Sequence, residues 1–440
     1  MEQDNRENKY FDLDSIRPEP VSLPEEKKST KGVFFSGVIV GLAGAFLVFS
    51  IFYLGNRLQK YVELQNNSLA AQAEQLEFSE NSAITPTLVN KLQSLENTIR
   101  QKFYLGEVSS EELADGIYRG ILMALDDPYS EYFTAEELTA LMNQTQGIYY
   151  GIGAYVSLDE ATGLPKISGI IEGAPAEAAQ LRTNDIIYEV NGESTYGLSL
   201  SEAVALIKGE EGTEVVLTII REGESDYLKV PVTRAKVESP TVNFEMLDET
   251  TAYIQIVEFD DVTVDQFAEA LAVAKGSGME GLILDLRANP GGSLDAVVDI
   301  AEMLLPKGMI VYTEDKYGER IEYKCDGKRE FEQPMVVLVD MNSASAAEIL
   351  AGAIQDYGVG TLVGTTTFGK GIVQQVIPYS DGSAVKITIS SYFTPNGRNI
   401  HEVGIEPDVV CEFDGEAYYN TETPVDNQLE KAKEILEGMR

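Results

Sequence analysis

The sequence predicts an α/β protein whose folded part follows one transmembrane helix, and three observations carry this prediction. Residues 33–54 form an apolar run without a single charge. Residues 146–236 read as short strands with glycine-rich turns. From residue 239 onward, β-branched apolar runs alternate with helical patterns, which is typical of a parallel sheet with crossover helices. The length of 440 residues fits two to four domains.

We divide the chain into six parts on these patterns. They are a polar cytoplasmic tail (1–31), a transmembrane anchor (32–54), a stalk (55–85), an N-terminal helical domain (86–145), a middle domain (146–236) and an α/β core with a C-terminal helix (237–440).

The composition excludes several classes of function. Lys and Arg total 33 against 72 Asp and Glu, a net charge of −39, which argues against nucleic acid as a partner. Acidic surfaces mostly keep proteins soluble. Two cysteines and one histidine exclude a disulfide framework and a four-ligand zinc site, and no metal or cofactor is predicted. A single bridge between Cys325 and Cys411 stays open.

The apolar run VFFSGVIVGLAGAFLVFSIFYL (33–54) is long enough to span a bilayer as a helix. It is too long for the apolar part of a signal peptide and has no small-residue cleavage site, so we expect it to be uncleaved. Basic residues gather before it, namely Arg6, Lys9, Arg17, Lys27, Lys28 and Lys31. The positive-inside rule therefore predicts a single-pass protein of the cell membrane with a cytoplasmic N-terminus and an extracytoplasmic remainder. Gly37 and Gly41 could pair two anchors, or simply reflect how common glycine is in membrane helices.

The segments that flank the anchor differ in pattern. Residues 1–31 are polar, contain three prolines and predict disorder, whereas the Gln- and Glu-rich residues 56–82 predict a helical stalk. Leu88, Leu92, Leu95 and Ile99 then recur at helical spacing, and residues 111–125 form a second amphipathic stretch. The motif DDPYSEYF (126–133) ends it.

The middle domain opens with the strand YYGIGAYV (149–156) and continues through NDIIYEVNG (184–192). It resembles a PDZ domain over residues 146–236. The resemblance implies that the backbone N–H groups of Gly151, Ile152 and Gly153 capture the terminal carboxylate of a peptide, which adds as a strand to the sheet edge. Glycines suit this role because they let the backbone approach a ligand closely. The alternative is an interaction domain that only scaffolds.

The core places three loops at one edge of the predicted sheet. EGLILDLRANPGGS (280–293), PMVVLVDMNSAS (334–345) and TLVG (361–364) each read as a strand followed by a turn. The carboxyl ends of parallel strands lie along one edge, where ligands bind. Loops 287–293, 340–345 and 365–371 should therefore converge there.

Lys370 in GTTTFGKG (364–371) has two readings. The spacing resembles a phosphate-binding loop, but such a loop needs a hydroxyl after the lysine and then a helix. Gly371 follows instead, and residues 372–393 predict a β-hairpin with a turn at Asp381 and Gly382. The second reading is a general base, because burial can lower a lysine pKa toward neutrality. Gln374 falls on the same strand face by even spacing.

Ser345 likewise has two readings. Ser345 and Glu348 form a capping box before a helix. A serine at a helix N-terminus is also well placed as a nucleophile, because free N–H groups lie near its oxyanion.

The stretch NSASAAEILAGAIQDYG (342–358), followed by LVGTTTFGKGIVQ (362–374), is similar to the signature of the C-terminal processing peptidases, or tail-specific proteases. These are Ser–Lys endopeptidases with a crotonase-like core and an inserted PDZ domain. The resemblance implies that Ser345 is the nucleophile, Lys370 the base and Gln374 the residue that orients it. It implies an oxyanion hole from the N–H of Ala346 and of Gly291 or Gly292. Ala347 departs from the third serine of the family motif.

The function implied is that of a membrane-anchored serine endopeptidase that binds exposed C-terminal tails of proteins, works through an acyl-enzyme and forms a homodimer. The resemblance also implies that the PDZ domain controls assembly of the active site. Two alternatives stay in view. One is a catalytically silent PDZ scaffold. The other is a Ser–His mechanism through the single histidine, His401, although we expect His401 to be a structural or surface residue.

Overall fold

The computed structural model of the chain describes residues 82–328, 331–419 and 424–440. The chain divides into two units, Met1–Ala83 and Ile84–Arg440, and the second contains all the elements below. The predicted tail and anchor, and nearly all of the stalk, lie outside the described residues. None of the helices in the described ranges combines the length and the apolar composition that a membrane span requires.

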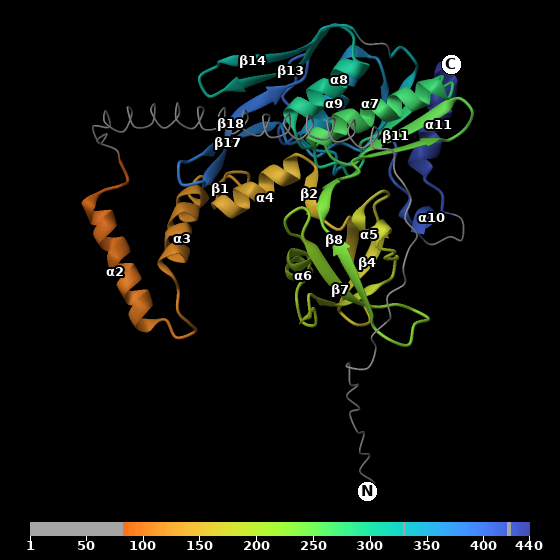
Figure 1. Cartoon of the computed structure of the whole chain (residues 1–440). Coiled ribbons are helices and arrows are strands. Elements are labelled where there is room, and N and C mark those ends of the chain that lie inside the picture. The colour runs from red at the N-terminus through yellow and green to blue at the C-terminus, as the bar shows by residue number, and fades with distance from the viewer. Residues whose placement is uncertain (1–81, 329–330, 420–423) are drawn as a thin grey trace, which may run out of the picture. The chain divides into compact units, whose positions relative to one another are not determined.

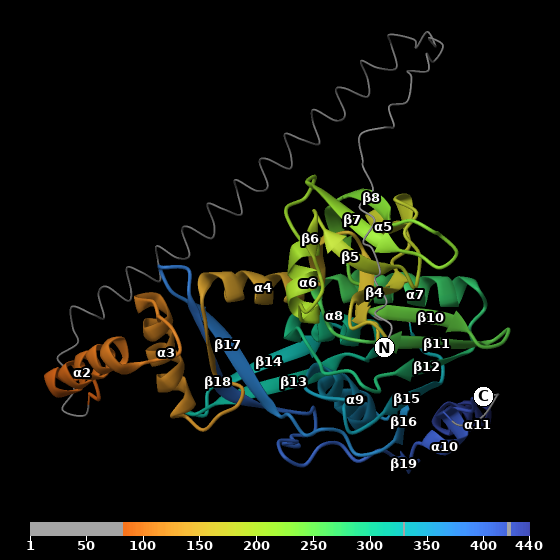
Figure 2. The same ribbon diagram turned by 90° about the horizontal axis from the view of Figure 1, so that it is seen from below.

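The core is built on a six-stranded sheet with the order β10-β11-β12-β15-β16-β19 (Figure 1, Figure 2). Its strands are β10 (Val242–Met246), β11 (Thr251–Ile256), β12 (Gly281–Asp285), β15 (Met335–Val339), β16 (Thr361–Gly364) and β19 (Val409–Val410). All neighbours pair in parallel except β10 and β11, which are antiparallel. The predicted parallel sheet is confirmed, and its central strands β12 and β15 are buried at every position.

Helices cover both faces of this sheet. They are α7 (Asp261–Gly276), α8 (Leu294–Leu304) and α9 (Ala346–Tyr357) on one face and α11 (Asn427–Met439) on the other. Leu282 and Leu284 of β12 join the apolar cluster with the first three helices, while Ile283 between them joins the cluster of α11. Alternation along an extended strand sends successive side chains to opposite faces, so a strand buried on both faces is apolar throughout.

A second sheet has the order β1-β18-β13-β14, with β17 paired to β18. Its strands are β1 (Glu131–Phe133), β13 (Gly308–Asp315), β14 (Arg320–Cys325), β17 (Ile372–Pro378) and β18 (Ala384–Phe393). β17 and β18 form an antiparallel hairpin, closed where the Tyr379 N–H donates to the Ser383 carbonyl at 2.8 Å. The predicted hairpin after Lys370 is therefore confirmed, and no helix follows that lysine as a phosphate loop would require.

The helices α2 (Pro86–Lys102) and α3 (Ser110–Met123) precede this sheet in the chain, and α4 (Ala135–Thr145) follows its first strand, β1. Ser109 and Glu112 form a capping box at the start of α3. The DDPYSEYF motif ends α3, as predicted, and then continues into β1, which pairs with β18 of the core. Neither α2 nor α3 contains a buried residue.

The middle domain has its own sheet, in the order β3-β4-β5-β7-β8 with β6 beside β5. Its elements are β3 (Ala154–Leu158), β4 (Pro165–Ile170), α5 (Pro175–Ala178), β5 (Ile186–Val190), β6 (Glu193–Ser194), α6 (Leu200–Ile207), β7 (Glu214–Ile220) and β8 (Leu228–Thr233). A separate apolar cluster fills it, and β2 (Ile148–Gly151) pairs with β9 (Ala235–Glu238) where the chain enters and leaves. The last short helix is α10 (Gly415–Tyr419), and Cys325 and Cys411 are both free thiols.

Candidate functional site

The three predicted loops meet at the carboxyl edge of the core sheet. The Ala344 N–H donates to the Asn289 carbonyl at 2.9 Å, which joins the loop after β15 to the loop after β12. The Phe368 N–H donates to the Ser343 carbonyl at 3.0 Å, which joins the loop after β16 to the loop after β15. The predicted convergence is confirmed, because each loop is hydrogen-bonded to its neighbour.

Ser345 is placed at the sharp turn from β15 into α9. Its φ of 55° and ψ of −113° lie outside the extended conformation usual for a helix cap. A non-glycine residue in such a conformation is strained, and strain of this kind gathers at functional sites. Gly291 lies directly against it, since a Cβ on Gly291 would sit 2.7 Å from the Ser345 Cβ and 2.9 Å from the Ala346 nitrogen. Only glycine allows this approach, and its φ of 101° also favours glycine.

The backbone donors near Ser345 differ in whether they are already bonded. The Gly291 N–H donates to Asn289 Oδ1 at 2.8 Å, so it is occupied. The Gly291 carbonyl accepts from the Phe259 N–H at 2.8 Å. The N–H groups of Gly292 and Ala346 donate to no acceptor among the described residues. Of the two glycines left open by the sequence, Gly292 is thus the one with an available N–H.

Glu348 connects the loop of Ser345 to the loop of Lys370. Its carboxylate is fully buried and accepts four hydrogen bonds, from the N–H groups of Ser345 (2.9 Å), Gly369 (2.7 Å) and Lys370 (2.9 Å) and from the Thr367 hydroxyl (2.6 Å). All four contacts are donors, so both oxygens act purely as acceptors. One side chain therefore fixes the spacing of the two backbones.

The Lys370 side chain points to a different neighbour from the one that the sequence suggests. Its Nζ lies 4.5 Å from the centroid of the Tyr129 ring and makes no hydrogen bond with Ser345 Oγ. Burial, and after it the Lys386 ammonium, lower the pKa of Lys370, while Asp127 and Glu348 act in the opposite direction. The lysine thus has the lowered pKa that a general base needs, but the structure does not join it to Ser345.

Gln374 lies on β17 and donates its amide Nε2–H to Thr388 Oγ1 at 3.1 Å. In the structure, even spacing does not place Gln374 beside Lys370 on one strand face. β17 begins only at Ile372, and a register shift between Val373 and Gln374 interrupts the alternation of its side chains. Gln374 is hydrogen-bonded to the neighbouring strand rather than to the lysine.

His401 packs behind the Lys370 loop. A Cβ on Gly371 would lie 2.6 Å from the His401 backbone nitrogen, so this glycine is required by the close contact. His401 Nδ1 is buried and has no hydrogen-bond partner among the described residues. A Ser–His–carboxylate triad needs a carboxylate on this ring nitrogen, and none is bonded there.

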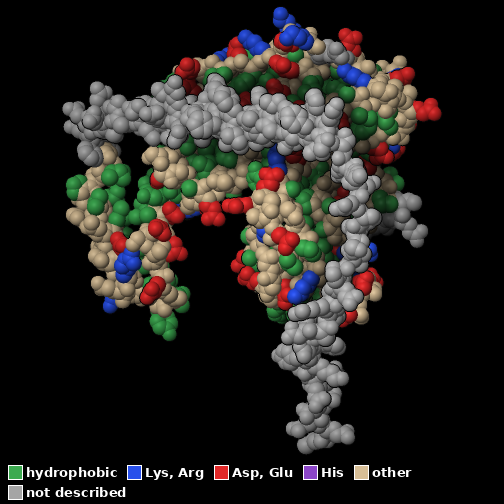
Figure 3. Space-filling view, viewed as in Figure 1, with side chains coloured by type: hydrophobic (Ala, Val, Ile, Leu, Met, Phe, Trp, Pro, Cys, Tyr) green, Lys and Arg blue, Asp and Glu red, His purple; other side chains and the backbone are tan. Residues whose placement is uncertain are grey.

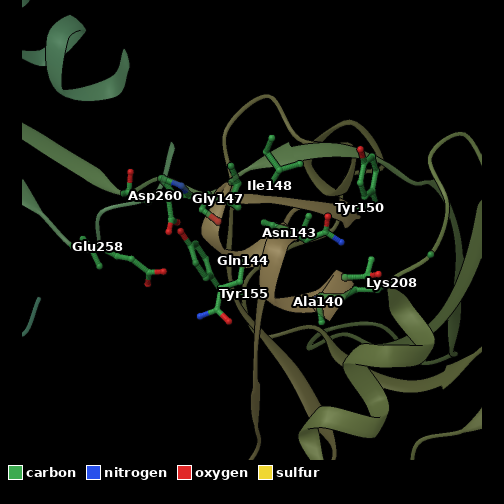
Figure 4. A pocket seen from close by; sticks show the side chains of 18 of the residues that line it. Ala140, Asn143, Gln144, Gly147, Ile148, Tyr150, Tyr155, Lys208, Glu258 and Asp260 are labelled. Atoms are coloured by element: carbon green, nitrogen blue, oxygen red, sulfur yellow. The ribbon is translucent and has the colours of Figure 1, made fainter. Parts of the chain in front are cut away.

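The predicted carboxylate-binding loop connects β2 to β3 and is buried. The N–H groups of Ile152 and Gly153 donate to no acceptor within the described part of the chain. Gly153 has a φ of 74°, and a Cβ there would lie 2.2 Å from the Ala174 Cβ. Beside this loop is a cavity of about 860 Å³, lined by residues of α4, the middle domain and the core (Figure 4).

Figure 4 shows which groups face this cavity. The Tyr155 ring extends toward Glu258 and Asp260, and Lys208 lies at the opposite side near Tyr150. Burial raises the pKa of Tyr149, which also lines the cavity, to about 12. Burial and the neighbouring Glu258 raise the pKa of Asp260 to about 8. The cavity therefore combines tyrosine side chains with Glu258 and Asp260 on one side and with Lys208 and Glu210 among its other lining residues.

Sequence reasoning missed two contributors to the site. Glu348 was read only as the third residue of a capping box, although that position was a signal for a carboxylate next to Ser345. Tyr129 lies in the DDPYSEYF motif, which predicts the end of a helix and shares in the resemblance to the peptidase family but indicates no contact with Lys370. No local pattern placed it near Lys370, because the contact depends on β1 joining β18.

Comparison with known proteins gives matches along most of the chain. Peptidase family S41 matches residues 250–411, the PDZ domain matches residues 166–221, and the N-terminal domain of the activating protease CtpB matches residues 38–137.

Individual proteins are also similar. The carboxy-terminal processing protease CtpA of Bacillus subtilis is 37% identical over 325 residues, covering 74% of this chain and 69% of that protein. The carboxyl-terminal-processing protease of Synechocystis sp. is 32% identical over 403 residues, covering 90% of this chain and 93% of that protein. Among solved structures, the photosystem II D1 C-terminal processing protease is 32% identical, covers 73% of this chain and 86% of that chain, and has a TM-score of 0.44.

Proposed function

Because this chain belongs to the C-terminal processing peptidases of family S41, as a serine protease with a PDZ domain, we propose that Ser345, Lys370 and Gln374 carry its chemistry. The family inferred from the sequence is confirmed, and a catalytically silent scaffold is no longer needed to explain the PDZ domain. The observation that supports the residue assignment is Glu348, which binds the backbones of Ser345 and Lys370 together.

The reaction follows from the donors around Ser345. Lys370, as the free amine, takes the proton of the Ser345 hydroxyl while Ser345 Oγ attacks the carbonyl carbon of the peptide bond. The N–H groups of Ala346 and Gly292 hold the oxyanion. Gly292 fits this role because a trans peptide points its N–H away from its carbonyl, and the Gly291 carbonyl faces Phe259. The leaving amine then takes the proton from Lys370, and water hydrolyses the acyl-enzyme with the same base.

Lys370 has to move from its position over Tyr129 to reach Ser345. We propose that Gln374 then orients the lysine amine beside Ser345. This requires the Gln374 amide to exchange Thr388 for the lysine, with its carbonyl oxygen as the acceptor. A neutral amide orients the amine without the pKa increase that a carboxylate would cause.

Cleavage of fluorescently labelled β-casein, an unfolded polypeptide, tests these assignments. We expect Ser345→Ala and Lys370→Ala to lose at least about a thousandfold in kcat, because removing one member of a nucleophile–base pair removes the mechanism. Gln374→Ala should lose less, and His401→Ala should stay near the wild-type rate. If Lys370→Ala keeps full activity while His401→Ala abolishes it, the Ser–Lys assignment is wrong.

We further propose that the loop of Gly151, Ile152 and Gly153 binds the terminal carboxylate of a substrate tail. The free N–H groups of Ile152 and Gly153 support this, since donors without a partner can bind an anion. Calorimetric titration of the Ser345→Ala form with an apolar decapeptide should show binding. The same peptide with an amidated C-terminus should bind at least about tenfold more weakly, and equal binding would contradict carboxylate capture.

Residues 33–54 support a single-pass anchor in the cell membrane, with the protease portion on the extracytoplasmic side. Alkaline extraction of membranes should leave the full chain in the pellet and release a chain that lacks residues 33–54. Protease added outside spheroplasts should digest a tag at the C-terminus and spare a tag at the N-terminus. The opposite pattern would reverse the proposed topology.

We also propose a homodimer that covers the apolar faces of α2 and α3. Large apolar side chains are exposed on both helices, including Val89, Leu95, Ile117, Ile121 and Met123 (Figure 3). We expect a second copy of this chain to cover these faces, because adjacent helices with no buried residue need a partner for their apolar side chains. Sedimentation should give a dimer for the full chain in detergent and a monomer for Ile117→Glu combined with Ile121→Glu. Gln101→Glu, at an exposed polar position of α2, is the control.

A further inference from the structure

The Lys370 ammonium has an aromatic neighbour from a distant part of the chain. Its Nζ lies 4.5 Å from the centroid of the Tyr129 ring, which belongs to the turn between α3 and β1. Among the described residues, Lys370 Nζ has no hydrogen bond or ion pair. The ammonium group therefore has a cation–π contact in place of a hydrogen bond or an ion pair.

The turn that presents Tyr129 is held firmly. The Tyr129 N–H donates to Asp127 Oδ1 at 3.0 Å, and the Ser130 hydroxyl donates to Asp127 Oδ2 at 2.6 Å. The Thr388 N–H of β18 donates to Ser130 Oγ at 3.2 Å, next to the β1–β18 ladder. The ring is thus positioned by the same strand whose Thr388 side chain accepts from Gln374.

Three other charged groups act on Lys370 from the elements packed around it. Lys386 on β18 repels its charge, whereas Asp127 in the α3–β1 turn and Glu348 on α9 attract it. Lys386 is itself paired with Glu131 on β1 at 3.5 Å. A cation over an aromatic face is attracted by the negative centre of the ring, and this attraction is lost when the amine is neutral.

We propose that Tyr129 is a positioning residue for Lys370, whose ring face holds the lysine ammonium in the resting enzyme and releases the neutral amine toward Ser345. The inference rests on the proposed Ser345–Lys370 chemistry. It makes the turn after α3 part of the control of the base, since the ring stabilises only the charged form.

This role has a consequence for the pH dependence of cleavage. A ring that stabilises the ammonium raises the pKa of Lys370, so its removal should lower that pKa. The acid limb of kcat/KM reports the base of the free enzyme. In Tyr129→Leu we expect this limb to move to lower pH by about half a unit to one unit, given the usual strength of such contacts.

The test measures kcat/KM for labelled β-casein from pH 5 to pH 10 with the full chain. Tyr129→Phe keeps the ring and should keep the acid limb at its wild-type position. Tyr317→Leu is a matched control, because Lys316 Nζ lies 5.0 Å over that exposed ring, and it should leave the limb in place. A merely structural role would lower kcat in Tyr129→Leu without moving the limb, and that result would overturn the proposal.

A second substitution covers the case in which Tyr129→Leu does not fold. A trifluorinated phenylalanine at position 129 keeps the shape of the ring and weakens its negative face, so the limb should move in the same direction by a smaller amount. An unmoved limb in this folded variant also overturns the proposal. Lys370→Ala distinguishes a failure of the proposed base from a failure of the proposed role of Tyr129. Full activity in Lys370→Ala refutes Lys370 as the base. If Lys370→Ala is inactive and the acid limb is unmoved in the Tyr129 variants, only the role of Tyr129 is refuted.

Discussion

Replacing Glu348 with glutamine should separate the two halves of the active site. The glutamate accepts hydrogen bonds at both oxygens, with Thr367 and Gly369 on Oε1 and Ser345 and Lys370 on Oε2. Glutamine supplies one acceptor oxygen and one amide nitrogen. With the amide nitrogen at the Oε2 position, the N–H groups of Ser345 and Lys370 face a donor inside a fully buried site. With it at the Oε1 position, the Gly369 N–H does, because the Thr367 hydroxyl can turn and accept.

The magnitude follows from the bonds lost. A hydrogen bond to a charged group contributes about 1.5–3 kcal/mol, so losing one or two should lower the free energy of unfolding by about 1.5–6 kcal/mol. Activity should fall by at least about a hundredfold, because small shifts of reacting groups have effects of that size. The chain has no tryptophan, so urea unfolding is followed by far-UV circular dichroism, with β-casein cleavage measured in parallel.

Glu437→Gln is the matched control, since Glu437 is exposed on α11. It should change neither quantity appreciably. If Glu348→Gln loses less than about 1 kcal/mol of stability and keeps its activity within about threefold, the four contacts do not hold the site together.

Three further predictions concern charge, space and protonation. Lys386→Met should raise the pKa of Lys370 by removing a like charge, which moves the acid limb of kcat/KM to higher pH; an unmoved or lowered limb would contradict this. Gly291→Ala should reduce kcat at least about a hundredfold while the chain still folds, because the new methyl group would lie against Ser345; near-normal kinetics would refute the close approach. Burial raises the pKa of Asp260 from 3.8 to about 8, so the unfolded chain loses this proton first, and stability should fall as pH rises from about 4 to about 8. Asp260→Asn should remove that fall and leave the protein more stable above pH 8 by about 1–3 kcal/mol, as read from urea midpoints at each pH.

Several parts of the fold could be predicted because their signals are local. β12 and β15 are continuous apolar runs, and such runs fit strands buried on both faces. Gly371 and the β-branched residues after it excluded a helix, and β17 is the result. The meeting of the loops that carry Gly291, Ser345 and Lys370 also followed from sequence, because parallel strands place their carboxyl ends at one edge.

Other parts could not be predicted, because they depend on contacts between distant segments. The strand beginning at Ile372 and the register shift before Gln374 place that side chain on Thr388, which spacing alone did not indicate. The occupied N–H of Gly291 depends on where Asn289 turns its amide.

The sequence by itself determined which residues this protease has available: a serine at a helix start, a lysine after a strand and glycines that admit a close backbone. It could do so because residue type and local spacing set the chemistry that a segment can offer. Only the tertiary structure decided how those residues are held, with Glu348 joining the backbones of Ser345 and Lys370 and Tyr129 facing the lysine ammonium. These contacts arise from the packing of α9, the β16–β17 loop and the turn after α3. Their geometry therefore depends on how these distant segments pack and not on the sequence of any one of them.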